Sequence, residues 1–72
     1  MKCSCGNASF YAVQRIEKYE TVLVDGDGDF AKVVPDDGNH FHHPDANSCV
    51  DCDRAEGPFF CTACGKEYEE IG

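Results

Sequence analysis

The first half of the chain has the pattern of apolar and polar residues that β-strands show. Residues 10–13 and 21–24 are rich in β-branched and aromatic side chains, and residues 14–20 between them place polar residues among apolar ones. No helical spacing of apolar residues is sustained in this part of the chain. We therefore expect extended structure over residues 10–25, either as one long bent strand or as two strands.

An acidic, glycine-rich segment at residues 25–29 (Asp-Gly-Asp-Gly-Asp) separates this stretch from the apolar residues 30–34. Glycines that take positive φ are typical of tight turns, so the segment predicts a β-hairpin. A calcium loop is the alternative, because the three aspartates match positions 1, 3 and 5 of an EF-hand. Phe30 stands where an EF-hand needs glycine, and Asp36 stands where it has glutamate, so the hairpin is favoured.

Residues 35–58 are rich in turn-forming residues and contain all the histidines, His40, His42 and His43, together with Cys49 and Cys52. A structureless loop of this length is uncommon inside a compact domain, so we expect a contact that ties it down. After this segment, Phe59 and Phe60 lead into the last cysteine pair, and residues 66–71 predict a short terminal strand.

The six cysteines form three close pairs, Cys3 with Cys5, Cys49 with Cys52, and Cys61 with Cys64. Two thiolates one or two residues apart can bind one zinc ion at about 2.3 Å each, and two such pairs complete a tetrahedral site. A disulfide framework is less consistent with the sequence. No apolar run of a secretory signal peptide follows Met1 and Lys2, and disulfides across such short gaps are strained.

The glycines that follow two of the pairs favour one choice of ligands. After the second cysteine of a zinc knuckle, the tight turn that presents two cysteines to the metal, a glycine relieves the strain of positive φ. Gly6 and Gly65 occupy this position, whereas Asp53 follows the middle pair. The glycines thus favour a main site of Cys3, Cys5, Cys61 and Cys64.

Pairing Cys49 and Cys52 with Cys61 and Cys64 stays open as the alternative, because the shorter gap costs less loop entropy. The difference of about 2 kcal/mol is small beside the roughly 10–16 kcal/mol of structural zinc binding.

A second metal site is a further candidate, formed by Cys49, Cys52 and two of His40, His42 and His43. Thiolates and neutral imidazoles both suit zinc. The alternative is that the histidines lie on the surface and the two thiols are idle, and both interpretations stay open. We expect one Zn²⁺ ion, and a second if this site forms.

Length and charge restrict the class of protein. A chain of 72 residues forms one domain, residues 1–72, with a small core that metal would stabilise. Fourteen acidic residues against six scattered basic ones give a formal net charge of −8, which opposes binding to nucleic acid. We expect a protein partner with a basic surface, although the acidity can also serve solubility alone.

No apolar run approaches the roughly 20 residues of a membrane span, so we expect a cytoplasmic monomer that does not contact membranes.

The motifs together resemble a family of short bacterial, archaeal and phage zinc-ribbon proteins of unassigned function. The resemblance rests on the Cys-x-Cys-Gly opening at residues 3–6, the valine-rich stretch that ends in residues 24–30, and the aromatic-Cys-x-x-Cys-Gly motif at residues 60–65. It covers roughly residues 1–35 and 59–70. It implies a small metal-stabilised β fold, a zinc ribbon with a β-hairpin between knuckles that use Cys3, Cys5, Cys61 and Cys64, and a loop-rich insertion at about residues 35–58.

The function expected from these features is that of a zinc-binding structural and interaction module, an acidic adaptor. Four thiolates leave no open position for a substrate or water, and no catalytic constellation stands out, so we do not expect an enzyme. A rubredoxin-like electron carrier is one alternative, because four cysteines with following glycines also bind iron. A metal carrier that uses the histidine and cysteine insertion is the other.

Overall fold

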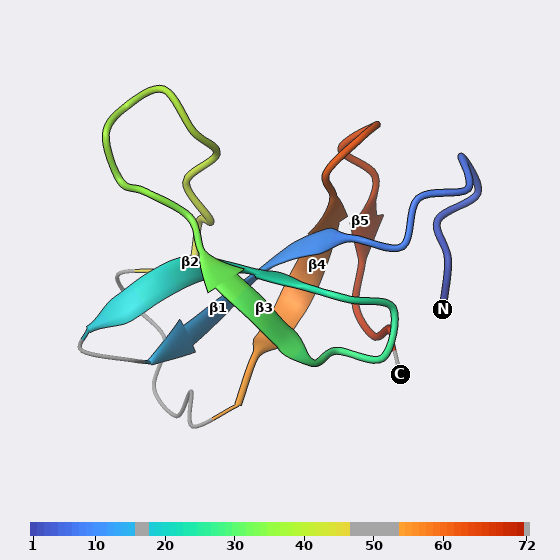
Figure 1. Ribbon diagram of the computed structural model, residues 1–72, viewed down its shortest axis with the longest axis horizontal. Coiled ribbons are helices and arrows are strands. Elements are labelled where there is room, and N and C mark those ends of the chain that lie inside the picture. Colours follow the sequence, from blue (N-terminus) through green and yellow to red (C-terminus); the bar gives the residue numbers. More distant parts are fainter. Residues whose placement is uncertain (16–17, 47–53, 72) are drawn as a thin grey trace.

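The computed structural model describes residues 1–15, 18–46 and 54–71, and these form a five-stranded antiparallel sheet (Figure 1). The strand order across the sheet is β3-β2-β1-β4-β5. The strands are β1 (Phe10–Arg15), β2 (Tyr19–Val24), β3 (Phe30–Val33), β4 (Glu56–Cys61) and β5 (Glu67–Tyr68). The predicted small all-β fold is confirmed, and the stretch over residues 10–25 is two strands. Within the described residues, no helix is long and apolar enough to cross a membrane.

The side chain of Asp25, the first residue of the turn between β2 and β3, stabilises this turn. The Asp25 carboxylate accepts hydrogen bonds from the backbone N–H groups of Asp27 and Asp29, at 2.9 and 3.0 Å. Gly28 has φ +86°, which an L-residue rarely adopts. β2 and β3 then pair with Leu23 opposite Lys32, so the predicted hairpin is confirmed.

Gly26, in the same turn, lets the N-terminal segment approach the sheet. The Met1 amino group donates a hydrogen bond of 2.8 Å to the Gly26 carbonyl. A Cβ atom on Gly26 would collide with the main-chain oxygen of Met1. The turn therefore also positions the residues just before Cys3.

β4 begins earlier than the sequence indicated. The inserted loop was expected to reach residue 58, but the strand starts at Glu56. β4 pairs with β1 in register at Phe10 opposite Cys61, and the register shifts between Tyr11 and Val13. Pro58 lies in this irregular part, and a strand tolerates proline best at a bulge, where its missing N–H is not needed.

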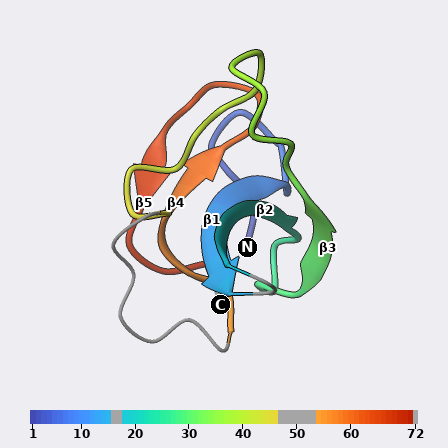
Figure 2. The same ribbon diagram turned by 90° about the vertical axis from the view of Figure 1, so that its left-hand side faces the viewer.

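Both faces of the sheet are covered at the central strand β1. Because side chains alternate along a strand, Phe10 and Ala12 of β1 point to one face, where the N- and C-terminal segments contribute Cys3 and Ile71 to the core. Val13 points to the opposite face and packs on Ala46 of the inserted segment. Figure 2 shows this segment arching back from β3 toward β4.

His43 ties the inserted segment to the sheet. Its side chain is completely buried, and its backbone N–H donates to the Thr21 hydroxyl at 2.8 Å. Ring atom Nε2 lies 2.6 Å from the Pro58 carbonyl oxygen, and Nδ1 lies 3.0 Å from the backbone nitrogen of Asp45. The carbonyl can only accept and the backbone N–H can only donate, so the ring carries its proton on Nε2. This clamp is the contact that the length of the segment led us to expect.

Aromatic packing supports the clamp. The Phe41 ring stacks on Tyr11 with ring centroids 4.5 Å apart, and it lies 5.2 Å from the ring of Phe60. His43 meets the same Phe60 ring at 5.4 Å. Residues 41–43 are thus held against β1 and β4.

Replacing His43 tests the clamp. His43→Phe keeps an aromatic ring but leaves the Pro58 carbonyl and the Asp45 N–H without their partners. We expect a loss of about 1–3 kcal/mol in total, because two partly buried groups lose their partners. Urea denaturation of the metal-loaded protein measures this loss. The control His40→Phe changes an exposed ring and should shift stability by less than about 0.5 kcal/mol. Equal effects of the two substitutions would show that His43 is not a clamp.

Candidate metal centre

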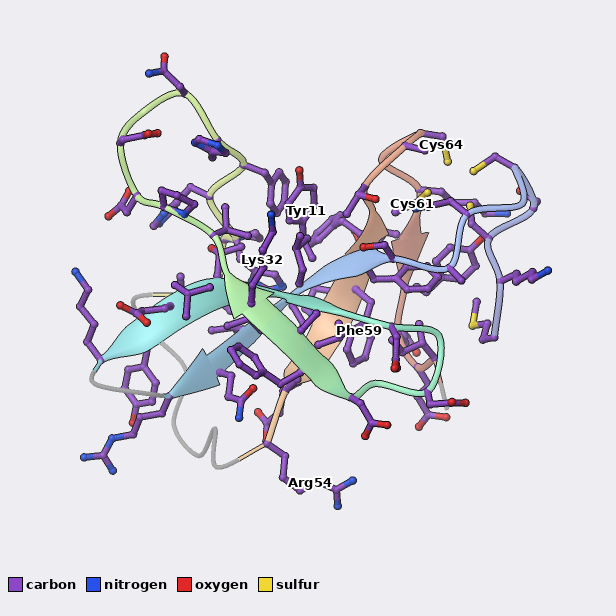
Figure 3. The ribbon with its side chains drawn as sticks, in the orientation of Figure 1. Tyr11, Lys32, Arg54, Phe59, Cys61 and Cys64 are labelled. Carbon is purple, nitrogen blue, oxygen red and sulfur yellow. The ribbon has the colours of Figure 1, made fainter. Side chains whose placement is uncertain are left out.

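The pairing of β1 with β4 brings two cysteine pairs together that are far apart in the sequence. Phe10 lies opposite Cys61, so the segment before β1 runs beside the turn that follows β4. The sulfur atoms of Cys3, Cys5, Cys61 and Cys64 all lie within 4.8 Å of one another. Figure 3 shows the yellow sulfur atoms gathered where the N-terminal segment passes Cys61 and Cys64. The four cysteines expected to form the main site therefore lie close enough together to hold a metal ion.

The spacing of the sulfurs suits a shared metal ion. Cys3 Sγ lies 3.4 Å from Cys64 Sγ, and Cys5 Sγ lies 3.5 Å from Cys61 Sγ. A disulfide needs a separation of about 2.05 Å, and all four cysteines are free. Zinc at about 2.3 Å from each of four sulfurs in a tetrahedron separates them by about 3.8 Å. These two separations are slightly below that value and the others are at most 4.8 Å, so the cluster has the size that one metal ion needs.

Each cysteine pair is presented by a tight turn that ends in glycine. The Gly6 N–H donates to the Cys3 carbonyl at 2.8 Å, and the Gly65 N–H donates to the Cys61 carbonyl at 2.9 Å. Their φ angles are +92° and +78°. A Cβ atom on either glycine would meet nothing within 4 Å, so the backbone angle, and not space, requires glycine. The expected positive φ at both positions is confirmed.

Hydrogen-bond donors from both cysteine segments point at the Cys61 sulfur. The backbone N–H groups of Ala63 and Cys64 and the side-chain amide of Asn7 each lie 3.4 Å from it. Asn7 also donates to the Thr62 hydroxyl at 2.8 Å, so it joins the two cysteine turns. Donors of this kind stabilise thiolate ligands and fix their orientation.

Tyr68 supplies a donor to the Cys3 sulfur. Its hydroxyl donates at 3.2 Å to Cys3 Sγ and accepts the Ser4 N–H at 3.3 Å. The pairing of β4 with β5 places Tyr68 opposite Phe59 and thereby directs it to the site. No spacing rule links Asn7 or Tyr68 to a cysteine in a distant segment, so the sequence alone does not identify them.

The electrostatic environment favours ionisation of two thiols at the expense of the other two. Burial opposes ionisation of Cys61, but the N–H of Cys64, the Asn7 amide and the N–H of Ala63 outweigh it and lower its pKa to about 5. The N–H of Cys5 and the Tyr68 hydroxyl lower the pKa of Cys3.

Cys64 and Cys5 show the opposite shift. The N–H of Lys66 favours ionisation of Cys64, but the sulfurs of Cys3 and Cys61 outweigh it and raise its pKa to about 12. The N–H of Asn7 likewise favours ionisation of Cys5, but the sulfurs of Cys3 and Cys61 raise its pKa. Four thiolates at these distances therefore need a cation among them.

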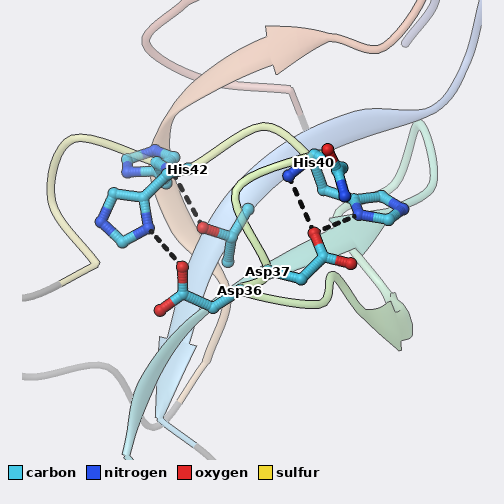
Figure 4. A network of polar contacts seen from close by, with 7 residues as sticks. Asp36, Asp37, His40 and His42 are labelled. Atoms are coloured by element: carbon cyan, nitrogen blue, oxygen red, sulfur yellow. Dashed lines mark hydrogen bonds and ion pairs between the residues drawn. The ribbon is translucent and has the colours of Figure 1, made fainter.

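The candidate second site lies partly outside the described residues, because Cys49 and Cys52 do so. Both ring nitrogens of His43 are already engaged, with Pro58 and Asp45. His40 and His42 are exposed, and their Nδ1 atoms lie 2.9 Å from Asp37 and 3.7 Å from Asp36 (Figure 4). The hydrogen bond from His40 and the N–H of Asn39 lower the pKa of Asp37. A site made with His40 and His42 stays a prediction.

The three aspartates of the β2–β3 turn also lie close together, with carboxylate oxygens within 4.8 Å of one another. All three are exposed. The hydrogen bonds that Asp25 accepts within the turn account for its orientation. The cluster is therefore explained as part of the hairpin.

No family model, no curated protein sequence and no solved structure matches this chain. The assignment of the metal centre therefore rests on the geometry of the four cysteines.

Serine substitutions distinguish the two pairings of cysteines. Cys61→Ser should unfold the domain under either pairing, because both use this residue. Cys3→Ser should remove the metal of the main site and lower the melting temperature sharply, since it removes one of the four clustered sulfurs, whereas the matched control Cys49→Ser should keep the metal of the main site. Metal analysis and thermal melting measure this. If Cys3→Ser melts like the wild type with its metal retained, the main site uses Cys49 and Cys52.

Proposed function

We propose that the protein is a zinc-ribbon-type module in which Cys3, Cys5, Cys61 and Cys64 hold one zinc ion. The observation that carries the proposal is the convergence of four sulfurs from both ends of the chain within 4.8 Å. Thiolates at tetrahedral spacing are the commonest donors of structural zinc sites. The backbone N–H groups and the Tyr68 hydroxyl that point at the sulfurs support the same chemistry.

The zinc ion would stabilise the fold by joining the N-terminal segment to the turn between β4 and β5. The last strand, β5, has two residues, and the N-terminal segment before β1 belongs to no strand. Structural zinc contributes its binding free energy directly to folding. A domain of this size with a modest apolar core needs such a contribution.

The role that this module serves is contact with another protein. Four coordinated thiolates leave no position for a substrate or an activated water, so catalysis at the metal is not supported. The formal net charge of −8 becomes more negative when four thiolates bind one divalent ion. Such a surface attracts basic protein surfaces and repels phosphate backbones.

Iron binding is the second candidate function, because the N–H groups aimed at the sulfurs suit a rubredoxin-like iron site equally well. A metal carrier is the third candidate function. Cys5 and Cys64 are exposed, so an ion bound between them is accessible for exchange with solvent.

Metal analysis tests the proposed site. We expect the purified protein to be colourless, to contain one zinc per main site, and to lose cooperative unfolding when a strong chelator removes the zinc, because the zinc-free core is too small. Elemental analysis and thermal melting measure this. A red protein with thiolate-to-iron absorption would instead indicate an electron carrier, and a protein without tightly bound metal would exclude both functions.

Nucleic-acid binding tests the type of partner. In mobility-shift assays at low salt, we expect no appreciable binding to DNA or RNA, because the negative surface repels phosphates. Binding to a basic protein surface should weaken as salt rises, since charges are screened over about 8 Å at physiological ionic strength. Micromolar binding to nucleic acid at about 0.15 M salt would contradict the proposed partner.

A further inference from the structure

β3 is an edge strand whose residues are all exposed. In the strand order β3-β2-β1-β4-β5 it pairs with β2 alone, and its four residues are exposed. Among the large apolar residues of the described parts of the chain, Phe30 and Val33 are unusually accessible, at 48% and 36%. An open strand edge with apolar side chains is a template for pairing with another strand.

The apolar side of β3 continues the core of the protein. Phe30 lies opposite Val24, and Val33 lies opposite Val22, because the register shifts between Leu23 and Val24 and so places these two residues, three apart in β3, on the same face. Val22 and Val24 are almost completely buried, and residues opposite each other in a sheet share a face. The core layer therefore extends to the edge of the sheet and ends there in two exposed side chains.

The backbone of β3 offers hydrogen-bonding groups at this edge. The Val34 N–H donates to the Thr21 carbonyl at 2.9 Å, so the main-chain groups of Val34 point toward β2. These groups alternate in direction along an antiparallel strand. The N–H and C=O of Val33 therefore point away from β2, toward the open edge.

Acidic residues flank the strand at both ends. Asp27 and Asp29 precede it, Asp36 and Asp37 follow it, and all four are exposed. Beside Val33 and Val34 a cleft of about 260 Å³ opens, and its lining residues include Glu20 and Asp36 together with Lys18. A second copy of this chain would bring the same acidic flanks and the same charge of −8 to the edge. A segment with positive charges at its ends is complementary to it.

We propose that β3 binds an extended segment of a partner protein as an added strand. The segment carries apolar residues at alternate positions, which cover Phe30 and Val33, and lysine or arginine at both ends, which meet the aspartates. Main-chain hydrogen bonds to Val33 and its neighbours provide affinity, as in other cases of strand addition. This inference rests on the proposed function as an interaction module and names the surface and the partner chemistry.

A model peptide tests the inference. The probe is Lys-Lys-Val-Thr-Val-Thr-Val-Lys-Lys, titrated into the zinc-loaded, ¹⁵N-labelled protein and followed by NMR. We expect the largest amide shifts over residues 30–34 and slower hydrogen exchange at Val33. A peptide with glutamate in place of every lysine should bind at least about tenfold more weakly, equivalent to about 1.4 kcal/mol.

Two substitutions of the same residue separate backbone from side chain. Val33→Pro removes the N–H at the open edge, which β2 does not use, and should weaken peptide binding at least about tenfold. The control Val33→Thr keeps the N–H and the branched shape and should change affinity by no more than about twofold. If Val33→Pro disturbs the fold, the double variant Asp29→Lys with Asp36→Lys replaces it and should reverse the preference between the two peptides.

Other outcomes overturn the inference. Peptide shifts located away from β3, equal binding of both peptides, or no binding at low salt would each exclude strand addition here while the zinc module still stands. Self-association through β3, detected by sedimentation as a dimer that Val33→Pro disrupts, would assign the edge to a second copy. Failure of the proposed zinc-module function is distinguishable from these outcomes, because the protein would then fold without metal.

Discussion

The approach of four cysteine sulfurs is the constraint on which the arrangement of the chain ends depends. Cys3 and Cys5 belong to a segment outside the sheet, whereas Cys61 ends β4 and Cys64 lies in the turn before β5. The β1–β4 pairing brings these segments side by side, and a shared ion would lock them. Core residues at both ends of the chain, Cys3 and Ile71, then cover one face of the sheet.

Electrostatics explain why the same cluster is unfavourable without a cation. Donors lower the pKa of Cys61 and Cys3, but the neighbouring sulfurs raise the pKa of Cys64 and Cys5. Two negative charges are thus accommodated by N–H and O–H groups, and the further two require a positive charge between the sulfurs.

Sequence motifs predicted those parts of the fold that depend on residues adjacent in the chain. The β2–β3 hairpin and the positive φ of Gly6 and Gly65 follow from residues adjacent in sequence, and they agree with the structure. The start of β4 at Glu56 depends on pairing with β1, which no local pattern reports. The clamp by His43 and the donors Asn7 and Tyr68 likewise arise from contacts between distant segments. The histidines among turn-forming residues suggested metal ligands, whereas the two ring nitrogens of His43 hold the inserted segment in place.

The edge strand shows how charge can separate two kinds of pairing. An open edge with Phe30 and Val33 invites any extended chain, including another copy of the same protein. The aspartates on both sides of β3 add like-charge repulsion to self-pairing, while a basic segment gains attraction from the same residues. Lys32 lies on the opposite side of the strand from Phe30 and Val33, because it pairs with Leu23, so it does not interrupt their apolar surface. In the proposed strand addition, the acidity of the chain would therefore act in two ways, by keeping copies apart and by selecting a partner of opposite charge.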